Sequence, residues 1–466
     1  MGDAPQVVIL GAGISGLGLG WRLAARGLSV DILESRGVVG GLAGTVRDDG
    51  CALDFGPHTF FSDDPEIRET VLGLFDPPLA PRPRRAKFLY QGRLLEYPLT
   101  AAGVLGQMGW QAGCRAAASC LWGRIAAGPR RPQAPAVEDQ SVEEWARAHF
   151  GEYLYRSFFQ PYTEQFWLMP ASALSARAIP SHTRMSFLRT LSWLLRRRHR
   201  GAPSLLDREA LPTYYPETGY GEIADRVARR VREAGGSIHL NCRAVAIERS
   251  PGPGLTVLAE CRGRPSRWEA ATVVSTIPLP ALIGMLRPLP PPEVHQAAEQ
   301  LDYRPLLVLG LVTTRQSLLK ADYVYQLDRP YNRLAEMNRF SPRTSPPGDN
   351  VLAVEIPCRR GDATWTAAKE ALFERCIGWL ERDGLLARRD VTRLLLVKAP
   401  DAYPIYRKGY AAALARCVAY VGQCPGLVLL GRTGEFRYLD ADQCLRRAFD
   451  LAERLLAAQA APVAAR

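Results

Sequence analysis

The sequence predicts an α/β fold whose parallel sheet is assembled from segments at the two ends and in the middle of the chain. The first apolar run, Val7–Leu10, is followed by a glycine-rich turn, an amphipathic stretch from Ile14 to Ala25 and a second apolar run, Leu28–Leu33. Strand, helix and strand in this order form a βαβ unit, whose strands are parallel. Two later runs, Thr272–Thr276 and Gly426–Leu430, have the length and composition of buried strands.

The segments between these runs alternate between strand and helix patterns. Phe88–Tyr97 has the pattern of a hairpin with Gln91-Gly92 at its turn, and the pattern from Ala101 to Trp193 is mostly helical. Further strands are expected at Ser237–Leu240, Val245–Ile247, Leu306–Thr313 and Val351–Ile356, and further helices at Ala224–Ala234 and from about Ala441 to Leu456. Because long insertions separate the runs of the parallel sheet, we expect two or three interleaved domains.

The composition is that of an ordinary globular chain. Hydrophobic residues make up 47% and charged residues 23% of the 466 residues, which excludes a disordered chain. No apolar stretch approaches the roughly 18 residues of a membrane span, and the first residues lack the charged region of a signal peptide. We therefore expect a cytoplasmic protein without a transmembrane segment.

Cysteine spacing and net charge give weaker indications. None of the ten cysteines forms Cys-x-x-Cys, so we expect no metal site and thiols that are mostly buried or idle in a reducing compartment.

The formal net charge is +12, but the arginines are mostly spread out, with one dense run at Arg196–Arg200. A solvated helix end and a contact with an anion or a membrane surface are two interpretations of this run. No nucleic-acid partner is expected, and the oligomeric state is left open.

The first turn of the chain carries a dinucleotide-binding fingerprint. Gly11-Ala12-Gly13-Ile14-Ser15-Gly16 is G-x-G-x-x-G between a predicted strand and a predicted helix. Its first glycine makes the tight turn, its second lets a pyrophosphate approach the backbone, and its third allows close packing of helix and strand. Glu34 ends the second strand about 20 residues later, where a carboxylate accepts ribose hydroxyls.

A glycine doublet after Glu34 favours FAD over NAD. Five residues separate Glu34 from Gly40-Gly41. This spacing resembles the extended fingerprint of FAD enzymes of the glutathione-reductase-like superfamily, in which the doublet lets the backbone approach the cofactor phosphates. We therefore expect bound FAD.

A predicted helix start near the end of the sequence is a candidate for contact with the flavin ring. Asp440 and Gln443 stand three residues apart at a predicted helix start, which suits an arrangement like a capping box. The positive end of such a helix, aimed at the N1/C2=O edge of a flavin, stabilises the anionic reduced ring. An ordinary surface cap is the alternative interpretation.

Along nearly its whole length the sequence resembles the UDP-galactopyranose mutases and the related protoporphyrinogen oxidase-like and amine oxidase-like flavoproteins. The matching pieces follow one another in the family's order. They are Gly56–Phe60, Tyr162–Trp167, Tyr303-Arg304, Pro330–Glu336, Tyr403-Pro404 and Gly434–Asp440.

The resemblance implies a fold and a reaction. The fold is α/β, with a Rossmann-like FAD-binding domain (1–85, 205–285 and 411–466) interleaved with a mainly helical substrate domain (86–204) and a mixed or antiparallel sheet domain (286–410). The implied reaction is a ring-size isomerisation of a nucleotide-diphosphate sugar, or a related sugar transformation, through covalent catalysis by N5 of the reduced flavin.

The resemblance also implies roles for individual residues. His58 lies near flavin N5 and the substrate, and Arg304, Arg333, Tyr403 and Tyr438 hold the diphosphate; these five form the implied catalytic set. The implied substrate-binding residues are Tyr162, Trp167, Arg184 and Tyr331. The implied cofactor-binding residues are Gly11, Gly13, Ile14, Ser15, Gly16, Glu34, Gly40, Gly41, Arg432 and Asp440.

The chemistry of these residue types fits a diphosphate leaving group, because arginine forks and tyrosine hydroxyls absorb developing negative charge. The chain departs from the mutases at Phe61, where they carry a second histidine, and at Gln165-Phe166, where they carry Lys-Gln. Two other functions stay open: an FAD-dependent oxidoreductase that takes hydride from a C–N or C–C bond, and a flavin-binding module without turnover.

Overall fold

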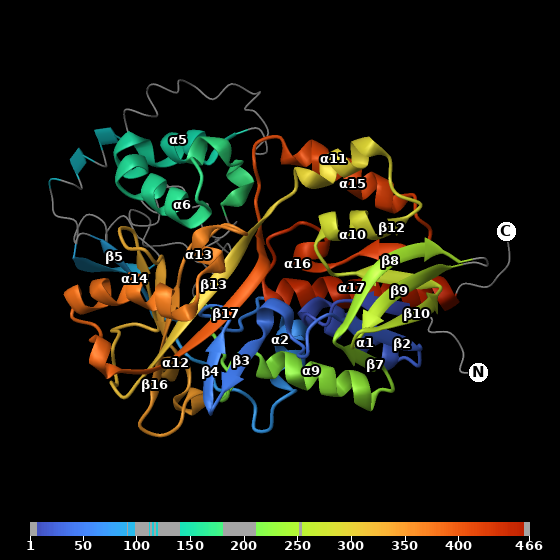
Figure 1. Cartoon of the computed structure of the whole chain (residues 1–466), viewed down its shortest axis with the longest axis horizontal. Coiled ribbons are helices and arrows are strands. Elements are labelled where there is room, and N and C mark those ends of the chain that lie inside the picture. Colours follow the sequence, from blue (N-terminus) through green and yellow to red (C-terminus); the bar gives the residue numbers. More distant parts are fainter. Residues whose placement is uncertain are drawn as a thin grey trace, which may run out of the picture.

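The computed structural model describes residues 7–90, 92–97, 140–179, 211–250 and 254–460, with a few isolated positions between 111 and 119. In this part of the chain, strands form a five-stranded, a four-stranded, a seven-stranded and a two-stranded sheet (Figure 1). The α/β fold class is confirmed. The positions of Arg184 and of the Arg196–Arg200 run lie outside the described residues.

The five-stranded sheet is entirely parallel and has the order β18-β11-β1-β2-β7. Its strands are β1 (Val7–Leu10), β2 (Val30–Glu34), β7 (Ser237–Leu240), β11 (Thr272–Ser275) and β18 (Leu427–Leu429). The order joins the start, the middle and the end of the chain in one sheet, as the sequence predicts.

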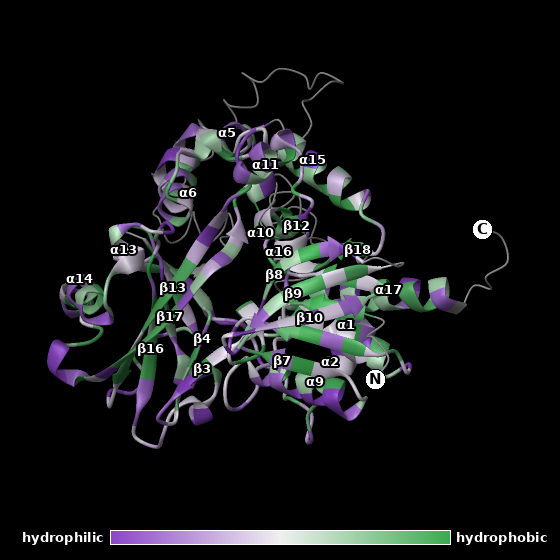
Figure 2. Ribbon diagram, turned by 45° about the vertical axis from the view of Figure 1, so that its right-hand side comes forward, coloured by the Kyte–Doolittle hydropathy of each residue, from purple (hydrophilic) through white to green (hydrophobic). Residues whose placement is uncertain are grey.

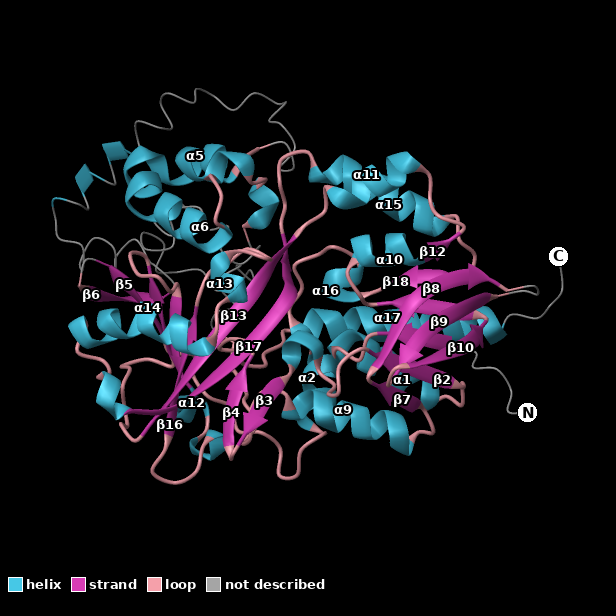
Figure 3. Cartoon of the chain, viewed as in Figure 1, coloured by secondary structure: helices cyan, strands magenta, loops and turns pink. Residues whose placement is uncertain are grey.

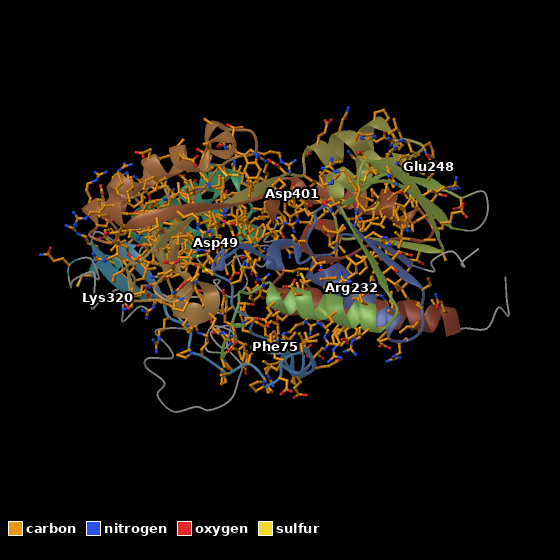
Figure 4. All side chains as sticks on the ribbon, turned by 60° about the horizontal axis from the view of Figure 1, so that its bottom comes forward. Asp49, Phe75, Arg232, Glu248, Lys320 and Asp401 are labelled. Atoms are coloured by element: carbon orange, nitrogen blue, oxygen red, sulfur yellow. A yellow bond between two sulfur atoms is a disulfide. The ribbon has the colours of Figure 1, made fainter. Side chains whose placement is uncertain are left out.

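Three helices pack around this sheet: α1 (Ile14–Ala24), α9 (Glu222–Glu233) and α17 (Ala441–Ala460). A Cβ added at Gly18 of α1 would lie 2.7 Å from Leu445 of α17, so the missing side chain lets these two helices approach closely. The amphipathic helix α9 buries Val227 and Val231, whereas Arg232, labelled in Figure 4, is exposed. Apolar spacing at helical period thus attaches α9 to the sheet.

The seven-stranded sheet has the order β17-β13-β16-β15-β14-β5-β6 (Figure 3). Its strands are β5 (Ala86–Tyr90), β6 (Arg93–Tyr97), β13 (Tyr303–Thr313), β14 (Tyr323–Gln326), β15 (Arg333–Glu336), β16 (Asn350–Glu355) and β17 (Val391–Pro404). Alternate residues of β13 serve two cores: Leu306 and Val308 join the core shared with the parallel sheet, whereas Leu307 and Leu309 pack in a separate core with α14 (Lys369–Arg382). Figure 2 shows hydrophobic residues along β16, which is buried on both faces.

One expectation about the domain layout differs from the structure. The hairpin β5–β6 was expected within the helical region 86–204, but β5 pairs in parallel with β14, so the hairpin extends the seven-stranded sheet. The described helices of that region include α5 (Val142–Leu154) and α6 (Gln160–Trp167). The α6 helix contacts the sheet at its end, where Gln165 donates to the carbonyl oxygen of Arg329 at 2.8 Å.

The four-stranded sheet contains β8 (Cys242–Arg249), β9 (Leu255–Cys261), β10 (Arg264–Ala270) and β12 (Leu286–Arg287). Cys242 and Cys261 stand directly opposite each other on β8 and β9 and form a disulfide. These two cysteines are an exception to the expectation of mostly buried or idle thiols, because strand register brings together residues that their spacing in the sequence leaves unrelated.

The small elements complete the described fold. They are β3 (Thr45–Asp48), β4 (Cys51–Asp54), α2 (Pro65–Leu72), α10 (Leu279–Met285), α11 (Pro292–Glu299), α12 (Met337–Phe340), α13 (Ala363–Thr366), α15 (Tyr410–Gly422) and α16 (Gly431–Gly434). Among the described residues, no helix has both the length and the apolar character that a membrane crossing requires. The same residues contain no group of three or more His, Cys, Asp or Glu arranged to hold a metal ion.

Candidate active site

A glycine-lined cradle is formed by the loop between β1 and α1 and the loop after β2. Gly11 and Gly40 have φ angles of 102° and 108°, which glycine adopts without strain. The N–H of Gly40 donates to the carbonyl oxygen of Ala12 at 2.8 Å. A Cβ added at Gly13 would meet only the Cα of Gly41, at 3.9 Å, among the described residues. The cradle is therefore open beside Gly13, next to the first N–H groups of α1.

Glu34 lies at the end of β2 beside this cradle and is 6% exposed. Its Oε2 accepts a hydrogen bond from the N–H of Ala12 at 2.8 Å, and its Oε1 accepts one from the N–H of Arg36 at 2.9 Å. A carboxylate has about four acceptor positions. Glu34 thus keeps acceptor capacity for hydroxyl groups of a ligand in the cradle.

The segment between β18 and α17 lies against the other side of the cradle. A Cβ added at Gly431 would lie 2.5 Å from the Oγ of Ser15, which is buried in the first turn of α1. The Nε of Arg432 donates to the carbonyl oxygen of Leu439 at 2.9 Å, which folds the segment back on itself. At the start of α17, the N–H of Asp440 donates to Oε1 of Gln443 at 3.0 Å, as their spacing predicts.

Two tyrosine hydroxyls attach this segment to the seven-stranded sheet. Tyr303, at the start of β13, donates to the carbonyl oxygen of Thr433 at 2.6 Å. The hydroxyl of Tyr406 accepts a hydrogen bond from the N–H of Tyr438 at 2.7 Å. The cradle and the sheet are therefore joined at the place where the predicted catalytic residues lie.

Three arginines gather at this junction, two of them around one carboxylate. Arg333 and Glu355 are cross-strand partners on β15 and β16, and Oε2 of Glu355 accepts from Nε of Arg333 at 2.8 Å and from its Nη2. Nη1 of Arg304, on β13, lies 3.7 Å from Oε1 of the same carboxylate. The Arg432 guanidinium lies 4.5 Å from the ring centre of Tyr438. We call these four charged residues the arginine chamber.

Arg304 is the least satisfied member of the arginine chamber. It is 2% exposed, and none of its three guanidinium nitrogens has a hydrogen-bond partner among the described residues. The guanidinium lies 4.0 Å from the ring centre of Phe166 and 5.4 Å from that of Tyr403. Burying such donors without a partner costs about 1–3 kcal/mol each, so the geometry is that of a cation prepared for an anionic ligand.

Tyr403 and Tyr438 line the same chamber. Tyr403 stands opposite Arg304 in the β13–β17 register, and its ring is stacked on that of Tyr438, with 6.0 Å between centroids. The Arg432 guanidinium lies 5.6 Å from the Tyr403 ring centre. Four residues of the predicted catalytic set, Arg304, Arg333, Tyr403 and Tyr438, therefore belong to the chamber or contact it. The fifth is His58.

His58 follows β4 in a tight turn in which its N–H donates to the carbonyl oxygen of Gly56 at 2.8 Å. Its Nδ1 is buried and has no hydrogen-bond partner among the described residues. Burial, followed by the charges of Arg333 and Arg432, lowers the pKa of His58 to about 3. The imidazole is therefore neutral at physiological pH and offers one donor and one acceptor.

Aromatic side chains form a wall beside the chamber. Tyr162 of α6 lies 5.6 Å from Phe88 and 5.9 Å from Tyr325, centroid to centroid, and burial raises its pKa. Trp167 contacts the ring of Phe166 edge-on at 5.1 Å. Tyr162 and Trp167 are thus placed next to the chamber, as expected for residues that line a ligand pocket.

Tyr331 is placed elsewhere. Its side chain is fully buried in the core that contains Leu372 and Cys376 of α14, whereas Arg333, two residues later, contacts Glu355 in the chamber. Because Tyr331 precedes β15 and packs on its α14 side, the structure does not bring it together with the other predicted substrate-binding residues. Its predicted role stays untested, as does that of Arg184.

Sequence patterns missed Glu355. No motif marks a glutamate at the end of an apolar strand, and its position opposite Arg333 depends on the pairing of β15 with β16. A polar residue that closes the apolar run of β16 is the one local signal that could have identified it.

Comparison with known proteins identifies the family. The sequence profile of the family described as flavin containing amine oxidoreductase matches residues 14–391. The chain belongs to this family. It is a flavin-dependent enzyme, and the resemblance to the UDP-galactopyranose mutases is confirmed by similarity over its whole length.

Two curated relatives align with very different shares of this chain. A probable UDP-galactopyranose mutase of Klebsiella pneumoniae is 22% identical over 464 residues, which is 98% of this chain and 96% of that protein. A chloroplastic protoporphyrinogen oxidase of Nicotiana tabacum is 30% identical over 175 residues, 37% of this chain and 30% of that protein. A crystal structure of reduced UDP-galactopyranose mutase superimposes with a TM-score of 0.81 at 19% identity and covers 97% of this chain and 94% of that chain.

The cradle fits the flavin cofactor of this family. The open side at Gly13 and the N-terminus of α1 suit a pyrophosphate, and the remaining acceptor positions of Glu34 suit ribose hydroxyls. At the junction between cradle and sheet, Arg432 lies close enough to His58 for its charge to lower the pKa of the imidazole.

Proposed function

We propose that this chain is an FAD-dependent mutase that acts on a nucleotide-diphosphate sugar and works with the reduced flavin. The observation that carries the proposal is Arg304, a fully buried cation without a hydrogen-bond partner among the described residues, in a chamber that holds three arginines and one carboxylate. The curated relative that matches nearly the whole chain bears the name of a UDP-sugar mutase, which supports this choice of substrate class.

Arginine forks suit a diphosphate because they bind two phosphate oxygens in one plane. All three guanidinium nitrogens of Arg304 lack a hydrogen-bond partner among the described residues. Arg333 donates to Glu355 through Nε and Nη2, which leaves its Nη1 for a ligand. In the dry chamber these cations stabilise the negative charge that develops when the bond between the sugar and the diphosphate breaks. The hydroxyls of Tyr403 and Tyr438 add donors that orient the same group.

A bound reduced flavin would supply the nucleophile at the anomeric carbon, so the reaction requires none from the protein. The chain's own residues have the remaining tasks. The neutral His58 would exchange hydrogen bonds without adding a positive charge beside the cofactor. The aromatic wall around Tyr162 and Trp167 would exclude water from the reacting sugar.

A flavin oxidoreductase acting on a C–N or C–C bond is the competing function, supported by the description of the family and by the protoporphyrinogen oxidase relative. The arginine chamber favours the mutase over an amine oxidase, because three cations repel a protonated amine and attract a dianion.

A turnover assay with the flavin-loaded protein distinguishes these functions. The protein is incubated anaerobically with UDP-galactose, with dTDP-sugars and with amines, once oxidised and once reduced with dithionite, and products and flavin absorbance are followed. The proposal predicts conversion of a nucleotide sugar by the reduced protein alone, without a change in flavin absorbance. Bleaching of the oxidised flavin by an amine, with no conversion of any nucleotide sugar, would overturn it.

A further inference from the structure

One carboxylate serves two arginines in the chamber. Glu355 is 2% exposed at the end of β16. Its Oε2 is occupied by Nε and Nη2 of Arg333, and its Oε1 lies 3.7 Å from Nη1 of Arg304 and 3.5 Å from the amide nitrogen of Asn332. The two arginines come from different strands, and Glu355 is the group that joins them.

The contact with Glu355 fixes the orientation of the Arg333 guanidinium. Because Glu355 holds the Nε and Nη2 edge, the guanidinium has one orientation, and Nη1 is left for a ligand. A Cβ added at Gly56 would lie 3.2 Å from Nη2 of Arg333, so the backbone on the other side leaves the guanidinium little room to rotate. Arg304 is pulled toward the same carboxylate without forming a hydrogen bond to it, so its donors stay available.

Glu355 also sets the charge of the chamber. Its carboxylate offsets one of the three guanidinium charges of Arg304, Arg333 and Arg432, whereas His58 is neutral and Asp440 acts on Arg432. A sugar-linked pyrophosphate carries two negative charges, whereas a free nucleoside diphosphate carries about three near neutral pH. The negative charge of Glu355 in this buried site therefore disfavours the more negative cleaved diphosphate relative to the sugar nucleotide.

We propose that Glu355 is a positioning residue that aims Arg333 and Arg304 at the substrate diphosphate and whose charge favours the sugar nucleotide over the free diphosphate. This inference rests on the proposed function, because it concerns the ligand of the same site. Glu355 itself does not contact the reacting atoms; it acts through the two arginines.

The test compares two substitutions at this position in the flavin-loaded protein. Glu355→Gln keeps the shape and removes the charge, so the ratio of UDP affinity to UDP-galactose affinity should rise at least tenfold. Glu355→Asp keeps the charge and withdraws the carboxylate by one methylene, so this ratio should stay within about twofold. Both should lower the conversion of UDP-galactose by the reduced protein at least tenfold, because Arg333 loses its support. Affinities are measured by titration calorimetry, and retained flavin and Tm report folding.

Glu336→Gln is the matched control. Glu336 is a buried carboxylate on the neighbouring strand β15, but its partners are the N–H groups of Leu318 and Leu319 and the side chain of Asn350. Its loss should lower the Tm and leave the affinity ratio unchanged.

An unchanged affinity ratio in Glu355→Gln, or an equal change in Glu336→Gln or Glu355→Asp, would overturn the proposal. Should Glu355→Gln fail to retain flavin, Glu355→Asp decides: a tenfold loss of turnover at normal Tm supports the positioning role, and normal turnover contradicts it. If the unaltered protein binds neither UDP nor UDP-galactose, the proposed function fails, which is a different outcome from normal binding with an unchanged ratio.

Discussion

Replacing Arg304 by methionine should separate ligand binding from stability. The side chain is fully buried, and its three nitrogens have no hydrogen-bond partner among the described residues. Methionine has a similar length and no polar hydrogen, so it fits against Phe166 without the cost of unsatisfied donors. Glu355 keeps its contact with Arg333, so the substitution leaves no unpaired carboxylate.

The expected magnitudes follow from these contacts. Burying a donor without a partner costs about 1–3 kcal/mol, and Glu355 keeps its contact with Arg333, so the Tm should stay the same or rise. Hydrogen bonds to charged groups contribute about 1.5–3 kcal/mol each. Losing two of them from a diphosphate should weaken UDP binding by about 3–5 kcal/mol, which is about 150- to 5000-fold.

The assay is titration calorimetry with UDP on flavin-loaded protein, together with thermal unfolding followed by flavin fluorescence. Arg329→Met serves as the control, because Arg329 pairs with Asp383 at 2.8 Å outside the chamber, and its loss should leave UDP affinity unchanged. The reasoning is refuted if Arg304→Met binds UDP within threefold of the unaltered protein, or if it unfolds at a markedly lower temperature.

Three further substitutions test the cradle and the buried titratable groups. Gly13→Val should fold but purify without flavin, because its side chain would project into the open side of the cradle; Gly378→Ala, at a helix position with no atom within 4 Å of an added Cβ, should purify with flavin, and a yellow Gly13→Val would contradict the placement. The pKa of His58 is lowered to about 3 by burial and by two arginines, so the unfolded chain takes up its proton first as the pH falls, and stability falls by up to about 1.4 kcal/mol per pH unit below about 6.5. Burial raises the pKa of Asp54 to about 6, so its contribution has the opposite sign and stability falls as the pH rises from about 4 to about 6. As the pH rises from 4.5 to 6, the stability of His58→Asn should therefore fall relative to that of the unaltered protein, and the stability of Asp54→Asn should rise relative to it, as measured by urea unfolding; parallel pH profiles would show that neither shift exists.

The sequence was sufficient for the parts of the molecule that depend on local patterns. The run Val7–Leu10 and the glycines after it predict a strand, a turn and a helix, and the structure shows all three. The spacing of Asp440 and Gln443 predicts their contact at the start of α17. Such features need only neighbouring residues, so their physics can be read without knowing the topology.

Features that depend on strand register could not be predicted. The pairing of β5 with β14, the Cys242–Cys261 disulfide and the position of Glu355 opposite Arg333 each join segments that no local pattern relates. The role predicted for Tyr331 came from a motif of consecutive residues, and such a motif does not say on which side of the sheet each residue lies. The side chain of Tyr331 packs in the core with α14.

A crystal structure of the flavin-loaded protein with UDP tests the central claim most directly. The account predicts that the diphosphate lies within hydrogen-bonding distance of the Arg304 guanidinium and of Nη1 of Arg333, with the flavin ring between this ligand and Arg432. A diphosphate bound elsewhere, with the donors of Arg304 still unpaired, would contradict the account.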